Sequence, residues 1–272
     1  MQTEVMKEVE SGAYKRIPLE ILIEFANYCE NNSLNYSLAY GTLLGAVRHK
    51  GYIPWDDDID VFMPRKDYEV FRETYISEKY ELKDLRNDKH YPVGVAKLCD
   101  KKTEYYYLKT AKRNFGLFID IFVLDKAPVD LKERQRWLKQ TKNLQNWNRL
   151  INTNYSHYFY HANVKMKIKA LLAKCMYPFS IQIHTKLEKL YRMYNDCDGN
   201  IFCSPSDIRK GMKTFCYPDY YFQQYEKMEF ENHLFNVTAY YKEVLTTIYG
   251  DYMKLPPEEE RVPKHDMVAY YK

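Results

Sequence analysis

Residues 41–60 read GTLLGAVRHKGYIPWDDDID, and this stretch decides the fold class. Gly41 and Thr42 follow a short strand expected at 36–40 and precede a helical stretch expected at 43–48. Glycine lets the backbone approach a phosphate, and a helix N-terminus offers free N–H groups with a partial positive charge. The start of the stretch therefore predicts a phosphate-binding turn, with Gly41, Thr42 and the nearby cation Arg48 as candidate ligands.

The end of the stretch places four carboxylates within five residues: Asp56, Asp57, Asp58 and Asp60. Acidic and apolar side chains alternate over 58–62, which predicts a strand with Asp58 and Asp60 on one face and the core on the other. Like charges this close repel unless a cation compensates them, and hard divalent metals such as Mg²⁺ take oxygen ligands of this kind. The pattern predicts a two-carboxylate metal shelf; the alternative is a solvated acidic turn.

A further carboxylate, Asp120, stands alone in the apolar run 117–124, which is expected to be a strand. Buried carboxylates are rare unless they are paired, hydrogen-bonded or bound to a metal. If this strand lies beside 58–62, the three aspartates could hold two Mg²⁺ ions, or Mn²⁺ in their place. Two such ions clamp the attacking and leaving oxygens of a phosphoryl displacement.

The rest of the chain predicts an α+β fold whose middle is largely helical. Hydrophobic periodicity indicates helices at 18–30, 66–75, 131–150, 163–176, 181–194 and 239–249, strands at 93–98 and 104–108, and a hairpin from 228–230 and 234–237. Loop is expected between 195 and 227, and an extended polar tail from 255. We therefore divide the chain into a catalytic core at 1–128, a helical insertion or subdomain at 129–215, and a C-terminal hairpin, helix and tail at 216–272 that complete the core.

Lysines flank the apolar stripe of the helix expected at 163–176. The pattern favours an ordinary amphipathic helix docked on the core. The alternative is a helix that lies at a membrane surface with its lysines snorkelling on both edges.

Composition excludes several classes of protein. Of the 272 residues, 46% are hydrophobic and 29% charged, so the chain can bury a core and is not a disordered tail. A net charge of +4 is small for a duplex-binding protein, so nucleic acid is not expected as a partner. The 28 tyrosines suit an aromatic-lined cleft, an interface or simple packing.

No secretory signal or bilayer-spanning run is visible, so a cytoplasmic location is expected, with peripheral contact to the inner face of the membrane left open. The cysteines show no CxxC spacing and are expected to be reduced thiols. Zinc binding by Cys197, Cys203 and Cys216 is the alternative for three of them.

The block at 41–60 resembles the hallmark motif of the LicD family, which is similar to fukutin and the fukutin-related protein and to the nucleotidyltransferase superfamily. Two further matches are Phe118–Phe122 and the C-terminal set Tyr249–Met253, Leu255–Pro257, Arg261 and His265.

The resemblance implies a nucleotidyltransferase-like mixed sheet flanked by helices, and a Mg²⁺-dependent phosphotransferase. It would move phosphocholine from CDP-choline to a hydroxyl of a cell-surface glycan, such as teichoic acid, capsule or lipopolysaccharide, or of its lipid-linked precursor, and release CMP. Asp58, Asp60 and Asp120 would be the catalytic and metal-binding residues, and Gly41, Thr42, Arg48 and Trp55 the donor-binding residues.

A choline head group binds aromatic faces, which makes Trp55 the best candidate wall of a cage, with Tyr105, Tyr106 and Tyr107 as additions. Three alternatives remain: transfer of ribitol or glycerol phosphate from the CDP-polyol, true nucleotidyl transfer from a triphosphate, and an inactive donor-binding scaffold. The identity of the general base, Asp120 or a metal-bound hydroxyl, also stays open.

Overall fold

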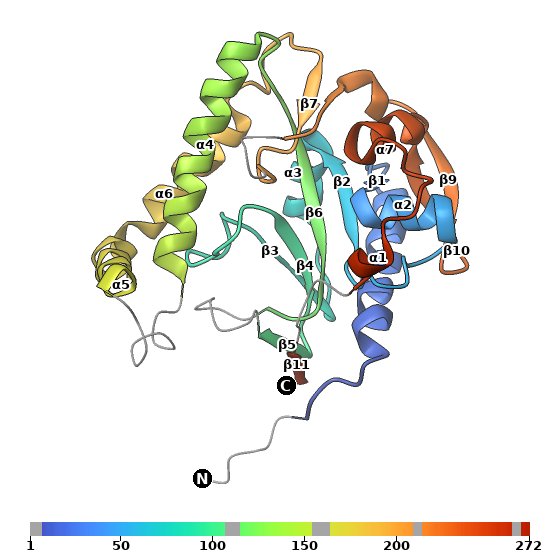
Figure 1. The fold of residues 1–272 in the computed structure, drawn as a ribbon, viewed down its shortest axis with the longest axis horizontal. Coiled ribbons are helices and arrows are strands. Elements are labelled where there is room, and N and C mark those ends of the chain that lie inside the picture. The colour runs from blue at the N-terminus through green and yellow to red at the C-terminus, as the bar shows by residue number, and fades with distance from the viewer. Residues whose placement is uncertain (1–6, 107–114, 154–163, 209–213, 263–267) are drawn as a thin grey trace.

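The structure, a computed structural model, describes residues 7–106, 115–153, 164–208, 214–262 and 268–272 (Figure 1). Its helices are α1 (Ala13–Asn31), α2 (Tyr40–His49), α3 (Arg65–Thr74), α4 (Leu131–Asn152), α5 (Val164–Met176), α6 (Ser180–Arg192) and α7 (Tyr241–Tyr249), with 3₁₀ turns η2 (Tyr177–Phe179), η4 (Asp219–Phe222) and η5 (Glu258–Glu260). Its strands are β1 (Ser37–Leu38), β2 (Asp60–Pro64), β3 (Tyr80–Lys83), β4 (Ala96–Asp100), β5 (Thr103–Tyr106), β6 (Phe118–Lys126), β7 (Ile201–Cys203), β8 (Cys216–Pro218), β9 (Tyr225–Phe230), β10 (His233–Thr238) and β11 (Val268–Tyr271).

The main sheet is mixed and has the strand order β1-β2-β6-β4-β3. Its one parallel pair in this order is β2 with β6, and the other neighbours are antiparallel. Beyond the centre, β7 pairs with the end of β6 and with β8. The hairpin β9–β10 and the pair β5–β11 form two small separate sheets. The parallel pair is the feature that positions the candidate site.

Helices flank the sheet on two sides. In Figure 1, α4, α5 and α6 lie on the left, whereas α2, α7 and the β9–β10 hairpin lie on the right. Helix α1 buries an apolar stripe that includes Ile21, Phe25 and Cys29, which recur with helical spacing. Helix α7 ends at Gly250, whose φ of +69° is a conformation that glycine adopts readily. The largest core cluster joins α1, the sheet, the hairpin and α7.

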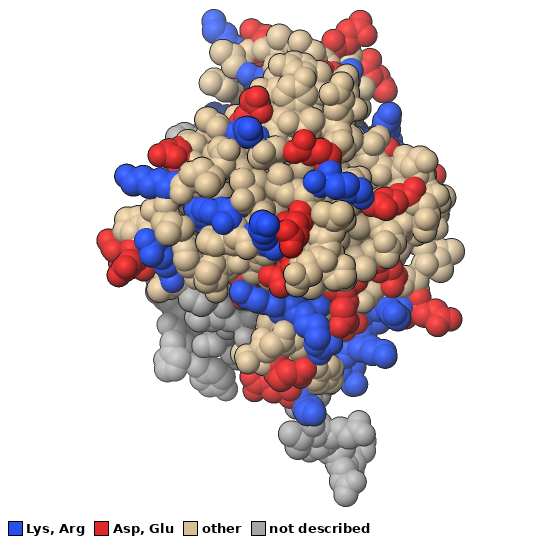
Figure 2. Space-filling view, turned by 90° about the vertical axis from the view of Figure 1, so that its right-hand side faces the viewer, with Lys and Arg blue, Asp and Glu red and all other residues tan. Residues whose placement is uncertain are grey.

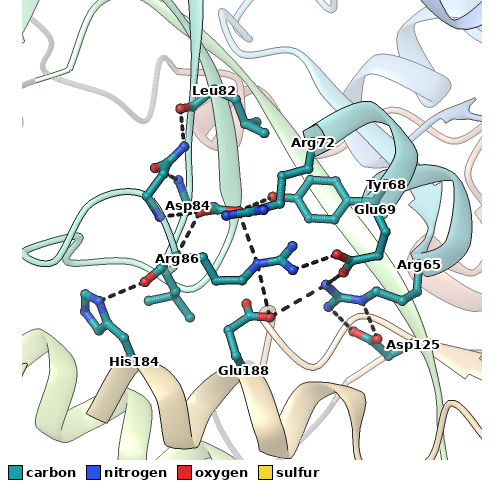
Figure 3. A network of polar contacts seen from close by, with 12 residues as sticks. Arg65, Tyr68, Glu69, Arg72, Leu82, Asp84, Arg86, Asp125, His184 and Glu188 are labelled. Atoms are coloured by element: carbon teal, nitrogen blue, oxygen red, sulfur yellow. Dashed lines mark hydrogen bonds and ion pairs between the residues drawn. The ribbon is translucent and has the colours of Figure 1, made fainter. Parts of the chain in front are cut away.

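A network of buried charges ties the helical side to the sheet (Figure 3). Arg65 at the start of α3 donates two hydrogen bonds of 2.7 Å to Asp125 at the end of β6. Glu69 accepts from Arg65 at 3.0 Å and from Arg86 at 2.6 Å. Glu188 of α6 lies 3.8 Å from Arg65. Because these partners come from four separate segments, the network fixes α6 against the sheet.

The α+β architecture with a mixed sheet flanked by helices is as the sequence predicts, and each expected helix is present within a few residues. Strand β2 begins at Asp60, two residues later than expected, so Asp58 lies in the preceding loop. Strands β3, β7, β8 and β11 were not expected, because each is short and lacks a clear alternating pattern.

The interpretation of α5 as a helix that docks its apolar stripe on the core is wrong. Its stripe residues Ile168 and Leu171 are 53% and 64% exposed. Within the described residues, no helix has the combined length and apolar character needed to cross a bilayer.

The face seen in Figure 2 carries charges of both signs, in keeping with the small net charge of +4. Acidic and basic side chains are mixed there around a large uncharged area, and several basic ones gather in the lower part of the view. This face therefore offers no broad basic surface of the kind that binds a nucleic-acid backbone.

Candidate active site

Two carboxylates meet at the start of the parallel strand pair. Asp60 of β2 is in register with Asp120 of β6, and the amide of Asp120 donates to the carbonyl of Ile59 at 2.8 Å. Residues in register on neighbouring strands lie side by side, about 4.8 Å apart along the hydrogen-bonding direction. The structure therefore brings together two of the three aspartates that the sequence predicts as a group.

Asp60 is held by the turn that opens the sequence motif. The buried hydroxyl of Thr42 accepts a hydrogen bond from the Asp60 amide at 2.8 Å. A Cβ atom at Gly41 would clash with the carboxylate of Asp56, so only glycine allows this close approach. Tyr40, just before this turn, has a φ of +40°, a strained conformation of the kind that clusters at functional sites. The turn thus positions two aspartates at once.

A buried lysine, which the sequence analysis missed, completes the carboxylate group. Lys97 of β4 is in register with Asp120, and its Nζ lies 2.5 Å from Asp120 Oδ1. The same ammonium lies 3.5 Å from the ring centroid of Phe118. The signal available in the sequence was one lysine inside a predicted buried strand, but its partner could be identified only from the register of β4 with β6.

Burial and, after it, repulsion between like charges oppose ionisation of Asp60. Burial raises the pKa of Asp60 well above its usual value, and the charges of Asp58, Asp120 and Asp56 raise it further, while Lys97 acts in the opposite direction. Among the described residues no donor forms a hydrogen bond to the Asp60 carboxylate. A buried carboxylate with several acidic neighbours and no donor is a group that a bound cation would stabilise.

The carboxylates of this group differ from a metal cage made of protein alone. Within the described part of the chain, no three His, Cys, Asp or Glu side chains form a group that encloses a metal ion by themselves. Mg²⁺ is usually bound through one or two carboxylates together with substrate phosphates, rather than by a cage made of protein alone. The Asp60 carboxylate beside Asp120 fits that mode of binding, with Asp58 in the adjoining loop.

A pocket near the carboxylates is lined by residues 41–56 and by residues 249–260, which are far apart in the sequence. Its volume is about 510 Å³, and Gly41, Arg48, Trp55 and Asp56 line it on one side. The opposite side is formed by the segment from Tyr249 to Pro257, together with Glu260. Asp58, Asp60 and Asp120 do not line this pocket. It adjoins them through Asp56 and Gly41, which line it, since Thr42 next to Gly41 accepts from the Asp60 amide.

Of the candidate donor-binding residues, Gly41, Arg48 and Trp55 line this pocket, whereas Thr42 is buried and does not. Arg48 donates to the carbonyl of Tyr252 at 3.1 Å, so its guanidinium links α2 to the C-terminal segment. Trp55 lies at the pocket wall, with the guanidinium carbon of Arg261 5.8 Å from its ring centroid. The Trp55 face is therefore a cation-binding surface in this structure.

The β9–β10 hairpin supports the acidic loop through Glu229 and Glu231, whose strand spacing in the sequence is equally typical of surface glutamates and so did not identify them. Glu231 Oε1 accepts from the amide of Tyr52 at 3.0 Å, and Glu229 lies 3.3 Å from Lys50. Both contacts fasten the turn at 50–52 that leads into Trp55 and the aspartates.

Other predicted residues lie elsewhere. Tyr105 is buried against Phe118 and does not line the pocket. The structure does not describe the side chain of Tyr106, nor any part of Tyr107 and His265. All six cysteines are free thiols. Cys203 and Cys216 face each other across β7–β8, and no metal-holding group forms around them within the described residues.

Comparisons with known proteins agree with this geometry. The sequence profile of the family described as LicD/FKTN/FKRP, nucleotidyltransferase domain, matches residues 33–159, which include both strands of the parallel pair. A lipopolysaccharide cholinephosphotransferase LicD of Haemophilus influenzae is 34% identical over 271 residues, covering 97% of this chain and 99% of that protein. An uncharacterised protein of Rickettsia prowazekii is 26% identical over 132 residues, 47% of each chain.

Proposed function

The chain belongs to the LicD family, and from this premise we propose that it transfers phosphocholine from CDP-choline to a hydroxyl of a cell-surface glycan or of its lipid-linked precursor, with release of CMP. The observation that carries most weight is the in-register pair of Asp60 and Asp120 beside a pocket walled by Trp55. The similarity to a lipopolysaccharide cholinephosphotransferase along nearly the whole chain supports the choice of phosphocholine.

The carboxylates are proposed to hold Mg²⁺ on the diphosphate of the donor, with Asp60 and Asp120 as the principal ligands and Asp58 from the adjoining loop as the third. When bound, Mg²⁺ would supply positive charge that neutralises the diphosphate oxygens. The protein itself orients this group, because Thr42 fixes the backbone at Asp60 and Lys97 fixes the carboxylate of Asp120.

The transfer would exchange one phosphorus–oxygen bond for another. The oxygen of the acceptor hydroxyl forms a bond to the phosphorus that bears choline, and the bond from that phosphorus to CMP breaks. Asp120 is the proposed acceptor of the hydroxyl proton. Gly41 and Arg48 line the pocket where the leaving CMP would lie, and most of the rate enhancement would come from positioning and charge stabilisation.

Trp55 is proposed to bind the choline head group. A quaternary ammonium ion prefers the face of an indole ring, and Arg261 already places a cation over that face. Choline would take the place of the guanidinium when the donor binds.

Calorimetric titration tests the proposal directly. The ligands are CDP-choline, CDP-ribitol, CDP-glycerol, CTP and ATP, each with and without Mg²⁺, and the variants are Asp60→Asn and the exposed-surface control Asp198→Asn. We expect Mg²⁺-dependent binding of CDP-choline that only Asp60→Asn abolishes. Preference for a CDP-polyol would retain the mechanism and change the substrate, whereas binding of a triphosphate alone would indicate nucleotidyl transfer.

Trp55→Ala separates head-group recognition from nucleotide binding. Loss of a cation–π contact of about 1–2 kcal/mol should weaken CDP-choline binding by about 5- to 30-fold. Binding of CMP should not change. An equal loss for both ligands would show that Trp55 shapes the nucleotide pocket instead.

A further inference from the structure

Helix α5 and the following turn η2 present an apolar surface to solvent, here called the α5 face. Its large side chains have exposed fractions between 43% and 72%. They are Val164, Ile168, Leu171, Leu172 and Phe179. Large apolar side chains gathered in this way mark an interaction surface more often than chance exposure.

The orientation of α5 is the reverse of that expected for a helix packed on a core. At 100° per residue, Ile168 and Leu171 fall on one face and Ala173 on the opposite one. Ala173 is 1% exposed, whereas Ile168 and Leu171 are 53% and 64% exposed. The helix therefore contacts the protein through a small residue and directs its bulky residues outward, at the edge of the molecule (Figure 1).

Lysines line both edges of the α5 face. By the same geometry, Lys165 and Lys169 lie along one edge of the apolar stripe, and Lys167 and Lys174 lie along the other. Side chains of this type can extend from an apolar surface so that the ammonium reaches a polar layer.

The surrounding sequence is strongly basic although the whole chain is nearly neutral. No aspartate or glutamate occurs between Glu133 and Glu188, while ten lysines and arginines do. An apolar surface bordered by uncompensated positive charge is complementary to a layer of anionic head groups above hydrocarbon.

We propose that the α5 face docks on the surface of an anionic lipid membrane. The apolar side chains would enter the boundary between head groups and acyl chains, and the lysines would contact lipid phosphates. A second copy of the chain is a poorer occupant, because a twofold interface would bring the lysine-lined edges of two helices together. The inference stands on α5 and its charge, and does not depend on the donor or acceptor of the proposed reaction.

The first test is co-sedimentation of the full chain with vesicles, in the absence of nucleotide. Vesicles of phosphatidylglycerol and phosphatidylcholine are compared with vesicles of phosphatidylcholine alone, at low and at high salt. We expect binding to the anionic vesicles that weakens as salt screens the lysines. Absence of binding to anionic vesicles, or equal binding to both kinds, would overturn the proposal.

Variants on the apolar stripe identify the surface. Ile168→Ser combined with Leu171→Ser should weaken vesicle binding at least about tenfold, since two exposed aliphatic side chains that would enter the lipid layer are lost. Ile76→Ser is the matched control, because Ile76 is 91% exposed and lies outside this surface. Both variants should keep the circular dichroism spectrum of the parent chain. Unchanged binding of the double variant would exclude the α5 face.

Charge variants test the lysine edges separately. Lys167→Gln with Lys174→Gln should weaken binding about 30-fold, and Lys66→Gln with Lys79→Gln, which lie on other elements, should have little effect. Light scattering provides the last control: a dimer of the parent chain that the Ile168 and Leu171 substitutions dissociate would assign the face to self-association and refute lipid docking.

Discussion

Replacement of Asp60 by asparagine should make the protein more stable even though we expect it to abolish activity. Asp60 is 8% exposed, and its pKa is raised by burial and by its acidic neighbours. A carboxyl whose pKa is higher in the folded than in the unfolded chain favours folding at low pH, and this contribution is lost as the pH rises through the folded pKa. At neutral pH the ionised Asp60 therefore opposes folding, and an uncharged amide of the same shape relieves that opposition.

The size of the effect follows from the strand register. Asp60 and Asp120 are in register on adjacent strands. Two charges about 4.8 Å apart repel by about 3 kcal/mol at an effective dielectric constant of about 20. Lys97 offsets part of the repulsion through its 2.5 Å contact with Asp120. A net gain of about 1–3 kcal/mol remains, which corresponds to a rise in melting temperature of about 2–5 °C for a chain of this length.

Thermal melts in EDTA measure the effect on the parent chain, on Asp60→Asn and on the control Asp198→Asn. The gain of Asp60→Asn should be larger at pH 8 than at pH 5, where the parent carboxyl is protonated to a greater extent, and the control should show no gain. Added Mg²⁺ should stabilise the parent chain more than the variant. A variant that melts at or below the parent temperature at pH 8 would refute the view that Asp60 is held against like charges.

Three further predictions concern other parts of the fold. Asp125→Ala removes two hydrogen bonds from the buried Arg65 guanidinium and leaves Glu69 and Glu188 as its counter-charges, so it should lower the free energy of unfolding by about 2–4 kcal/mol in urea titrations; a loss below 1 kcal/mol would contradict this. Gly41→Ala should displace the Asp56 carboxylate and reduce turnover about 100-fold with little change in melting temperature, whereas Gly12→Ala, where a Cβ meets open space, should change neither. Burial lowers the pKa of His184, so folding stability should fall as the pH drops below about 6.5, and His184→Gln should reduce that fall between pH 7.5 and 5.5 in urea midpoints.

The sequence predicts the elements of the site better than their connections. Asp60 and Asp120 can be identified from the sequence because each interrupts a run of apolar residues. Successive side chains of a strand point to opposite faces, so a carboxylate among apolar residues that form the core is conspicuous. The alternating pattern did not locate Lys97, since the pairing of Lys97 with Asp120 depends on how β4 aligns with β6. It also placed Asp58 inside the strand, whereas β2 starts at Asp60.

At α5, hydrophobic periodicity predicts the helix but not the direction in which its apolar face points. The spacing of Ile168 and Leu171 predicts an amphipathic helix, and the helix is present. Periodicity defines which residues share a face, but the direction of that face depends on packing against the rest of the protein. Here the small side chain of Ala173 is buried, and the bulky face is left outside.

The pocket beside the carboxylates has a consequence for the order in which the protein folds. One of its sides comes from residues 41–56 and the other from residues 249–260, so its walls are separated by about two hundred positions in the sequence. Contacts of such long range form late and slow the folding of a chain. During synthesis the N-terminal segments emerge first, and the pair of parallel strands can form well before the closing segment leaves the ribosome. A nascent chain would thus carry its carboxylates without the wall that residues 249–260 supply, and would complete the pocket only when that segment has emerged.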